Sequence, residues 1–510
     1  MSEGTATVSR IPQSFRPKQT YSQRFVRDVL ARPGARFGLA WIVVVVFFAV
    51  FGPFIANSHP IIMWDAEGNW SMPMFRWLHP VDVLLVLAFF ATLILTIGWR
   101  RRYSFGQNIA AAGWIVAAAI PPLFHAIVRA EWNQDQYSAV GRGFILCALI
   151  LVTPVWLTLI VWPMVRMSWS KAFKTGLGVV ALALWVTFIL MPISPPAVFT
   201  EKPYRQQIRE DGVTAIFTLI PFGPKDQMAD LPQARALPPG WYPKDPDSPN
   251  LSKKEKDKIA LARERGEPLP PRYQLLEGES YYNRLHLMGT TVANQDMASR
   301  MIHACRIALA IGFIATGIAV AIGVVVGGLL GYFSGWVDLL GSRVVEVFAS
   351  IPTIFLLIAI VAFYGRNIYL MMAIIGMTSW VGYANFVRAE FLRLRKQDFV
   401  QAAIACGLPL RSILFRHMLP NGVAPVLVNA SFGVAVAILT EATLSFLNLG
   451  LVDEPSWGQL LNQAREGGEF YWWIASFPGM AIFLTVFAYN LIGEAMRDSF
   501  DPHLKKASQI

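Results

Sequence analysis

The sequence predicts an all-α polytopic membrane protein with about ten transmembrane helices. Of its 510 residues, 55% are hydrophobic and only 15% are charged, whereas soluble domains carry about 25% charged residues. Ten mostly apolar runs occur along the chain, each long enough to cross the hydrocarbon core, which takes about 20 residues. The net charge of +11 does not indicate nucleic-acid binding, because the basic residues lie at the ends of the apolar runs.

The predicted spans form two groups of five on either side of a polar gap. The first group is 37–55, 81–98, 109–127, 144–162 and 176–191, and the second is 307–333, 345–364, 368–386, 423–449 and 472–491. The segment 1–36 is polar, and the first apolar run is long and lacks a small-residue cleavage site. We therefore expect 37–55 to be a retained anchor helix and not a cleaved signal peptide.

The distribution of lysine and arginine predicts the orientation of the spans. With the N-terminus inside, the cytoplasmic segments hold 23 basic residues and the four short outer segments hold five. Short cytoplasmic loops are enriched in Lys and Arg, so we expect both termini, including the tail 499–510, to be cytoplasmic. The polar segment 192–300 then faces outward.

The outward segment is rich in charge and proline. Residues 201–285 carry 14 basic and 13 acidic side chains and 12 of the 33 prolines, a composition that disfavours a packed core. Only the stretch LSKKEKDKIALARERG is suited to a short helix. We expect an irregular extracytoplasmic loop or a small cap.

No pattern for catalysis is present in the sequence. It contains no GxxxxGK[ST] phosphate loop, no GxGxxG after a strand and no HExxH, its seven histidines are scattered, and its three cysteines do not form a pair or cluster. We therefore predict no catalytic, cofactor-binding or metal-binding site in this chain. Its function should lie in passage, coupling or scaffolding.

The cytoplasmic stretch 395–421 carries the strongest signal. It reads as two short helices separated at Gly407, which can adopt positive φ, and Pro409, which suits the start of the second helix. We expect the pair Leu419-Pro420 to end the second helix before the next span. The first helix presents Phe399, Ala402, Ala403 and Cys406 on one face, and the second presents Ile413, Leu414 and Met418 beside Arg411 and Arg416. An amphipathic pair of this kind fits a protein groove or the lipid headgroup surface.

This stretch resembles the EAA loop of ABC importer permeases, with Gln401 in place of the leading glutamate. In that family the loop is a coupling helix that docks into a cleft of the ATPase subunit. The resemblance implies that the coupling residues are Gln401, Ala402, Ala403, Gly407, Leu408, Pro409, Leu419 and Pro420.

Further motifs are similar to the C-type permeases of dipeptide, oligopeptide and nickel importers. They are GYFSGWVDLLGSRVVEVFASIPTIFLLI, SWVGYANFVRAEFLRLRKQDFV, EATLSFLNLGL, PSWGQLL and FPGMAIFLTVFAYNLIGEAMRDSFDP. The resemblance extends over 285–503 and implies a type I permease core at 301–498. The extra spans in 81–191 would be a four-helix insertion, and FTLIPFGPKDQ is similar to the microcin-type branch. The usual LGTDxxGRD motif departs from the family pattern at 288–296.

The resemblance also implies partners and location. An importer of this kind would combine this chain with a second homologous permease, two cytoplasmic ATPase subunits and an extracytoplasmic substrate-binding protein, in the lipid bilayer of a bacterial inner membrane. The cargo could be a dipeptide, an oligopeptide, a modified peptide or a nickel chelate. An ion-gradient-driven secondary transporter and a membrane scaffold subunit are the alternatives.

Four residues inside the spans are candidates for helix packing. Gly323, Gly327 and Gly331 form a GxxxGxxxG ridge, which allows close approach either of a helix of the same chain or of a second permease. Glu441 lies within the ninth span, where an ionisable group is costly and requires a partner, such as Arg306. We expect Glu441 to hold the bundle together.

Overall fold

The computed structural model describes residues 21–65, 67–76, 213–228, 236–240, 253–266, 285–364, 366–450, 454–466 and 470–500, with single positions or short pieces between 78 and 204. Most of 1–36, nearly all of the predicted insertion 81–191 and the tail from 501 onward lie outside these residues.

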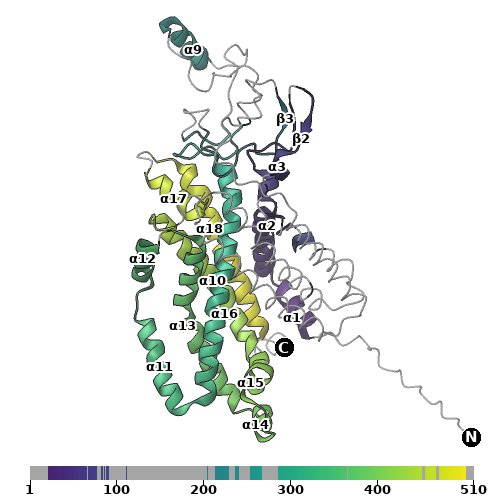
Figure 1. Cartoon of the computed structure of the whole chain (residues 1–510), viewed down its shortest axis with the longest axis vertical. Helices are drawn as coiled ribbons and strands as arrows, with labels where there is room; N and C mark the ends of the chain where they lie inside the picture. Colours follow the sequence, from purple (N-terminus) through teal and green to yellow (C-terminus); the bar gives the residue numbers. More distant parts are fainter. Residues whose placement is uncertain are drawn as a thin grey trace, which may run out of the picture.

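Five helices of the described part are long and apolar enough to span a membrane. They stand side by side along the long axis of the molecule (Figure 1). The 37 residues of the longest give a helix of about 55 Å, against about 30 Å for the hydrocarbon core, so it extends beyond the bilayer. The five helices confirm the first, sixth, eighth, ninth and tenth predicted spans: α2 (Pro33–Ile55), α10 (Met297–Phe333), α13 (Ile368–Arg395), α16 (Leu419–Phe446) and α18 (Trp472–Phe500).

The seventh predicted span, 345–364, is not one straight helix. The chain forms α11 (Gly335–Ala349) and α12 (Thr353–Tyr364), and the axes of the pair are bent by 69°. Pro352 lies in the break. Proline cannot donate a backbone hydrogen bond and disfavours helical geometry in the residue before it, which accounts for the break. The two helices together are apolar enough to count as one broken span, so the seventh span stays a prediction.

The permease core predicted at 301–498 begins inside α10, which starts at Met297, and ends inside α18, which runs to Phe500. As a domain assignment, 301–498 stays a prediction.

The two ends of the bundle carry different secondary-structure elements (Figure 1). One end holds α1 (Tyr21–Leu30), the last turn of α18 and the short helix α14 (Asp398–Ala405). There Arg32 forms an ion pair with Asp498, and the rings of Phe25 and Phe500 stack with centroids 4.6 Å apart. The chain therefore enters the first span and leaves the last one at the same end.

The opposite end carries a small sheet and two outer helices. Strands β1 (Ile62–Trp64), β2 (Trp70–Ser71) and β3 (Thr214–Ile216) pair antiparallel in the order β2-β1-β3, next to α3 (Pro73–Arg76). Helix α17 (Trp457–Glu466) lies at the same end but away from the sheet, beside α18 (Figure 1). Strands of two or three residues show no periodicity, so the sequence did not reveal the sheet. The expected short helix is confirmed as α9 (Lys253–Arg265).

Candidate functional site

The stretch 395–421 forms an elbow at the end of the bundle opposite the sheet (Figure 1). Helix α14 ends at Ala405, and Gly407 follows with φ of +68°, a conformation that favours glycine. The Leu408 amide donates to the Ala403 carbonyl at 3.2 Å, as in a glycine-terminated helix end. Pro409 is extended and precedes α15 (Leu410–Ser412). The predicted break between the two helices is therefore confirmed.

The predicted stop at Leu419-Pro420 is wrong. After α15 the chain forms a π-helical turn, η3 (Ile413–Met418), and then continues directly into α16. Leu419 keeps helical angles of −57° and −46°. Proline is tolerated in the first turn of a helix, where its missing donor has no partner to lose. The elbow is thus joined to the ninth predicted span by continuous helical backbone.

One side of the elbow packs against the protein. The predicted residues Ile413, Leu414 and Met418 are buried, as is Ala403, in a cluster with Val400 of α14 and with α13 side chains that include Phe391. An apolar cavity of about 110 Å³ lies beside η3. Its lining comes from α10, α13, η3 and the start of α16: Val324, Val325, Gly328, Leu329, Phe391, Leu414, Phe415 and Leu419.

The other side of the elbow is exposed. Phe399, Ile404 and Leu408 are 37–40% exposed, and Ala402 and Cys406 are exposed too. The face predicted for the first helix is therefore divided, with Ala403 inward and the other three residues outward. This leaves an apolar surface at the tip of the molecule that no described residue covers.

Gln401 has a local role that a glutamate could not fill. Its Nε2 donates to the Arg395 carbonyl at 2.8 Å, at the end of α13. A carboxylate only accepts hydrogen bonds, so the departure from the family residue provides a donor here. Arg395 in turn donates to the Ser334 hydroxyl, and to the Phe333 carbonyl at 3.3 Å.

The glycine ridge of α10 faces α13 of the same chain. A Cβ added to Gly327 would collide with the Ala384 carbonyl oxygen, and one on Gly331 would lie 2.6 Å from the Arg388 carbonyl oxygen. Gly323 lies equally close to α13 at Tyr383. Of the two alternatives, the structure therefore places this ridge in a contact within the chain.

Glu441 does not pair with Arg306. Its side chain is buried and its Oε1 accepts from the Ser445 hydroxyl at 2.7 Å, with a further side-chain hydrogen bond to Ser456. Arg306 instead forms an ion pair with Asp82, at the start of the predicted insertion. The predicted ion pair of Glu441 with Arg306 is wrong, because a buried carboxylate can also accept hydrogen bonds from serine hydroxyls, which a search for opposite charges does not find.

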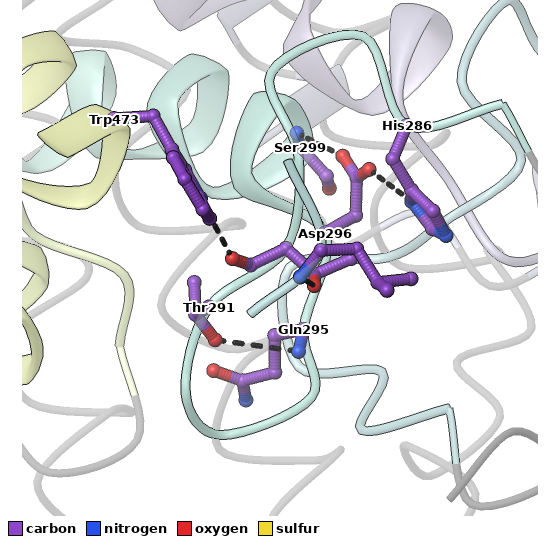
Figure 2. Close-up of polar contacts among 8 residues, drawn as sticks. His286, Thr291, Gln295, Asp296, Ser299 and Trp473 are labelled. Atoms are coloured by element: carbon purple, nitrogen blue, oxygen red, sulfur yellow. Dashed lines mark hydrogen bonds and ion pairs between the residues drawn. The ribbon is translucent and has the colours of Figure 1, made fainter. Parts of the chain in front are cut away.

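A buried polar cluster caps the opposite end of α10 (Figure 2). The ring of His286 and the carboxylate of Asp296 meet at 2.8 Å, with side chains 0% and 1% exposed. Asp296 is also the N-cap of α10, accepting from the Ser299 amide at 2.8 Å, which satisfies an otherwise unpaired helix donor. The indole of Trp473 donates to the Thr290 carbonyl at 3.2 Å. We call residues 286–300 the outer cap.

Arg300 connects the outer cap to two distant segments. It is 3% exposed and donates to the side-chain oxygen of Gln295, to the Gln459 side-chain oxygen on α17 at 2.6 Å and to the Pro224 carbonyl at 3.3 Å. Sequence reasoning missed this cluster because its partners lie far apart in the chain. An aspartate eleven residues before the apolar run at 307–333, at a position suited to a helix N-cap, was the one local signal.

The described residues hold no group of three or more His, Cys, Asp or Glu side chains arranged for a metal ion. The two candidate parts of the site are the exposed elbow at one end and the outer cap at the other.

Comparison with known proteins identifies the chain's family. The family of the binding-protein-dependent transport system inner membrane component matches residues 307–506, and the N-terminal TM domain of oligopeptide transport permease C matches 20–73. A solved structure of the MetNI methionine ABC transporter in an inward-facing conformation aligns with 40% of this chain and 98% of that chain, at 19% identity and a TM-score of 0.35.

The alignments with curated relatives extend over most of each relative's length. The oligopeptide transport system permease protein OppC of Haemophilus influenzae is 40% identical over 42% of this chain and 70% of that protein. The dipeptide permease DppC of Alkalihalophilus pseudofirmus is 36% identical over 43% and 73%, and the glutathione permease GsiD of Pectobacterium atrosepticum is 36% identical over 45% and 79%. The chain therefore belongs to the family of binding-protein-dependent inner-membrane transport components, as an integral membrane permease subunit.

Proposed function

We propose that this permease forms half of the translocation pathway of an ATP-driven importer of peptides or peptide-like solutes. The stretch 395–421 docks onto a cytoplasmic ATPase subunit, and the chain itself hydrolyses no ATP. The names of the relatives, which refer to oligopeptide, dipeptide and glutathione transport, support this class of cargo. The remaining components are a second homologous permease, two ATPase subunits and an extracytoplasmic binding protein.

The observation that carries this proposal is the exposed apolar side of the elbow. Phe399, Ile404 and Leu408 lie on α14 and directly after it, and α14 is at the extreme end of the molecule (Figure 1). These side chains form an exposed apolar surface next to the ends of α10 and α13, which fits a groove in a protein partner. The lipid headgroup surface is the alternative occupant, and the co-purification test below separates the two.

The proposed orientation places the elbow and both termini in the cytoplasm. The excess of Lys and Arg in the segments at that end supports it. The Arg32–Asp498 ion pair joins the start of the first span to the end of the last, so both termini enter the same side, whichever side that is. Residues 1–36 and 499–510 are then cytoplasmic, 37–55 is the anchor, and 301–498 is the permease core. The segment 192–300 is extracytoplasmic, and 81–191 is an inserted membrane bundle.

The test is co-purification of the ATPase subunits with tagged permease from membranes. Gly407→Asp strains a backbone with positive φ and adds a charge at the elbow, and Phe399→Glu adds a charge without backbone strain. We expect both variants to lose most of the bound ATPase. Gly68→Asp is the matched control, because Gly68 also has positive φ, 84°, with open space around its Cβ position. It lies between β1 and β2, at the opposite end of the molecule (Figure 1).

All three variants are first checked for monodisperse elution of the permease. If Gly407→Asp and Phe399→Glu both retain ATPase at the wild-type yield, the elbow is not the docking surface and the proposal is wrong.

A further inference from the structure

The apolar cavity beside η3 adjoins the lateral surface of the bundle. Of its eight lining residues, Val325, Leu329 and Phe415 are 48%, 38% and 49% exposed. The cavity volume of about 110 Å³ approaches that of apolar cavities of ~150 Å³, which hold benzene. The cavity therefore has room for a short stretch of hydrocarbon that enters from the side.

A stripe of apolar residues on α10 leads to this cavity. Ile314, Gly317, Ala321, Val325 and Leu329 are exposed, at intervals of three or four residues that place them on one side of the helix. The stripe is about 22 Å long, whereas an acyl chain covers about half of the hydrocarbon core, ~15 Å. Nothing lies within 4 Å of a Cβ added to Gly317, so the stripe leaves a shallow groove between Ile314 and Val325.

The cavity lies at the inner end of the apolar part of α10. Its α10 residues, 324–329, precede the end of the helix at Phe333 by about 6 to 14 Å. Just beyond them, Gly331 lies against Arg388, the first charged residue of α13. The cavity is therefore at the level where acyl chains meet their headgroups.

Two arginines of the elbow flank the exposed Phe415 at this level. Arg416 follows Phe415 directly, and Arg411 precedes it by about one helical turn. Both are exposed, and neither has a hydrogen bond or ion pair to its side chain among the residues that the structure describes. Neighbouring arginines do have acidic partners, in the pairs Arg388–Asp338, Arg393–Glu390 and Arg343–Glu346. The positive charge of Arg411 and Arg416 is thus available to an anionic group.

We propose that the junction of η3 with α10 binds an anionic phospholipid of the inner leaflet. One acyl chain passes through the cavity and follows the α10 stripe, and the phosphate lies at Arg411 and Arg416. Basic pockets between membrane helices on the cytoplasmic side suit anionic headgroups, and arginine holds phosphate oxygens with strong hydrogen bonds. We call this the lipid site. Its assignment to the inner leaflet rests on the orientation proposed above.

The lipid site is separate from the proposed docking surface. Phe399, Ile404 and Leu408 lie on α14 or directly after it, whereas the lipid site is formed by α10, α15 and η3. An acyl chain is fluid, so it fills the cavity and still allows η3 to move. The lipid would then support the turn that joins the elbow to α16.

The test is photolabelling of the full-length permease, with any co-purifying subunits, in phosphatidylcholine nanodiscs. One sample contains a small fraction of phosphatidylglycerol with a diazirine in its acyl chain, and the other contains phosphatidylcholine with the same chain. Mass spectrometry identifies the labelled peptides. This comparison of two lipids needs no variant, so it does not depend on whether a variant folds.

Two variants test the two parts of the site, after a check for monodisperse elution. Arg411→Gln combined with Arg416→Gln removes the charge, and Leu329→Trp adds bulk to the cavity wall. Arg36→Gln is the control for charge, because Arg36 is an exposed arginine near the start of α2, at the same end of the bundle. Val43→Trp is the control for bulk, on the exposed apolar surface of α2.

We expect phosphatidylglycerol to label 410–420 and 324–333 about tenfold more than phosphatidylcholine, because each basic residue near the membrane surface favours an anionic lipid. The double glutamine variant should lower this labelling to the phosphatidylcholine level. Leu329→Trp should reduce labelling by both lipids, and both controls should behave as wild type.

Three results would overturn the inference. Equal labelling of the wild type by the two lipids would mean that the site does not select an anionic headgroup. Undiminished phosphatidylglycerol labelling of the double glutamine variant would exclude the two arginines. Labelling of the permease alone that disappears in the complete transporter would show that another subunit covers the cavity.

The same preparations are assayed for bound ATPase, which separates this inference from the import function. Bound ATPase with equal labelling by the two lipids contradicts only the lipid site. Preferential labelling by phosphatidylglycerol supports the lipid site even where the wild-type permease retains no ATPase, a result that would contradict the import function alone.

Discussion

The two ends of the permease bundle are built in different ways. The outer cap buries its polar groups and connects segments from 224 to 473 through side-chain hydrogen bonds. The elbow has few such bonds and exposes apolar side chains at its tip. The comparison indicates that the outer end is fixed by its own chain, whereas the inner end is left for a partner to complete.

The largest effect on stability is expected from Asp296→Ala in the outer cap. The change removes the N-cap of α10 and the buried partner of His286, with an expected cost of about 3 kcal/mol or more. Thermal unfolding in detergent, followed by tryptophan fluorescence, measures it. Asp398→Ala is the control, because Asp398 is an exposed acid in the first turn of α14. An equal loss of thermal stability in Asp296→Ala and Asp398→Ala would show that the outer cap is no more strongly stabilised by its side chains than the elbow.

A smaller loss is expected from Arg300→Met. The variant leaves the Gln295 and Gln459 side-chain oxygens without their donor in a buried site, at a cost of about 2 kcal/mol. Arg465→Met removes an exposed arginine from α17 and should cost about 0.5 kcal/mol or less. Urea unfolding of both variants compares them. A neutral Arg300→Met would mean that the connection to α17 does not stabilise the cap.

Gln401→Glu should change stability by only about 0.5 kcal/mol, because the bond to the Arg395 carbonyl is exposed. The variant restores the family's glutamate and removes the donor. We expect slightly lower protection of the α14 amides in hydrogen exchange, with the outer cap unchanged. Wild-type exchange throughout α14 would contradict the donor role of Gln401.

Acid should weaken the outer end through His59. Burial lowers the pKa of His59 from 6.5 to about 4, so the unfolded chain takes up the proton first. Stability from this group is therefore present at neutral pH and falls as the pH drops from about 6.5 towards 4. His59→Gln should lose less thermal stability than wild type between pH 7 and pH 5. An equal loss of thermal stability in the variant and in wild type would contradict the lowered pKa of His59.

The sequence predicted those features of the fold that depend on neighbouring residues. Five spans and α9 were predicted from apolar runs and helix-forming composition, and the break at Gly407 and Pro409 from backbone preferences alone. The family resemblance from the motifs was confirmed by the matched ranges. The ten-span total includes the insertion at 81–191, which stays a prediction.

The failures have more than one physical cause. The pairing of Arg306 with Asp82 and the three-segment contacts of Arg300 depend on which distant residues meet. Glu441 instead bonds Ser445, one helical turn away, and a search for an opposite charge overlooks a hydroxyl partner. The bend at Pro352 was visible in the sequence, but the apolar character of 345–364 outweighed it. At the elbow, the sequence pattern identified the apolar residues, but it did not predict which of them are exposed and which are buried.

The π-helical turn η3 connects the elbow to α16 without a flexible joint. We expect a displacement of α14 to reach α16 through helical backbone, with any bend concentrated at η3, because π-helical turns are sites where helices kink. The apolar cavity beside η3 gives that turn room to compress before any core contact is lost. A movement of the proposed ATPase subunit would then tilt α16 within the membrane.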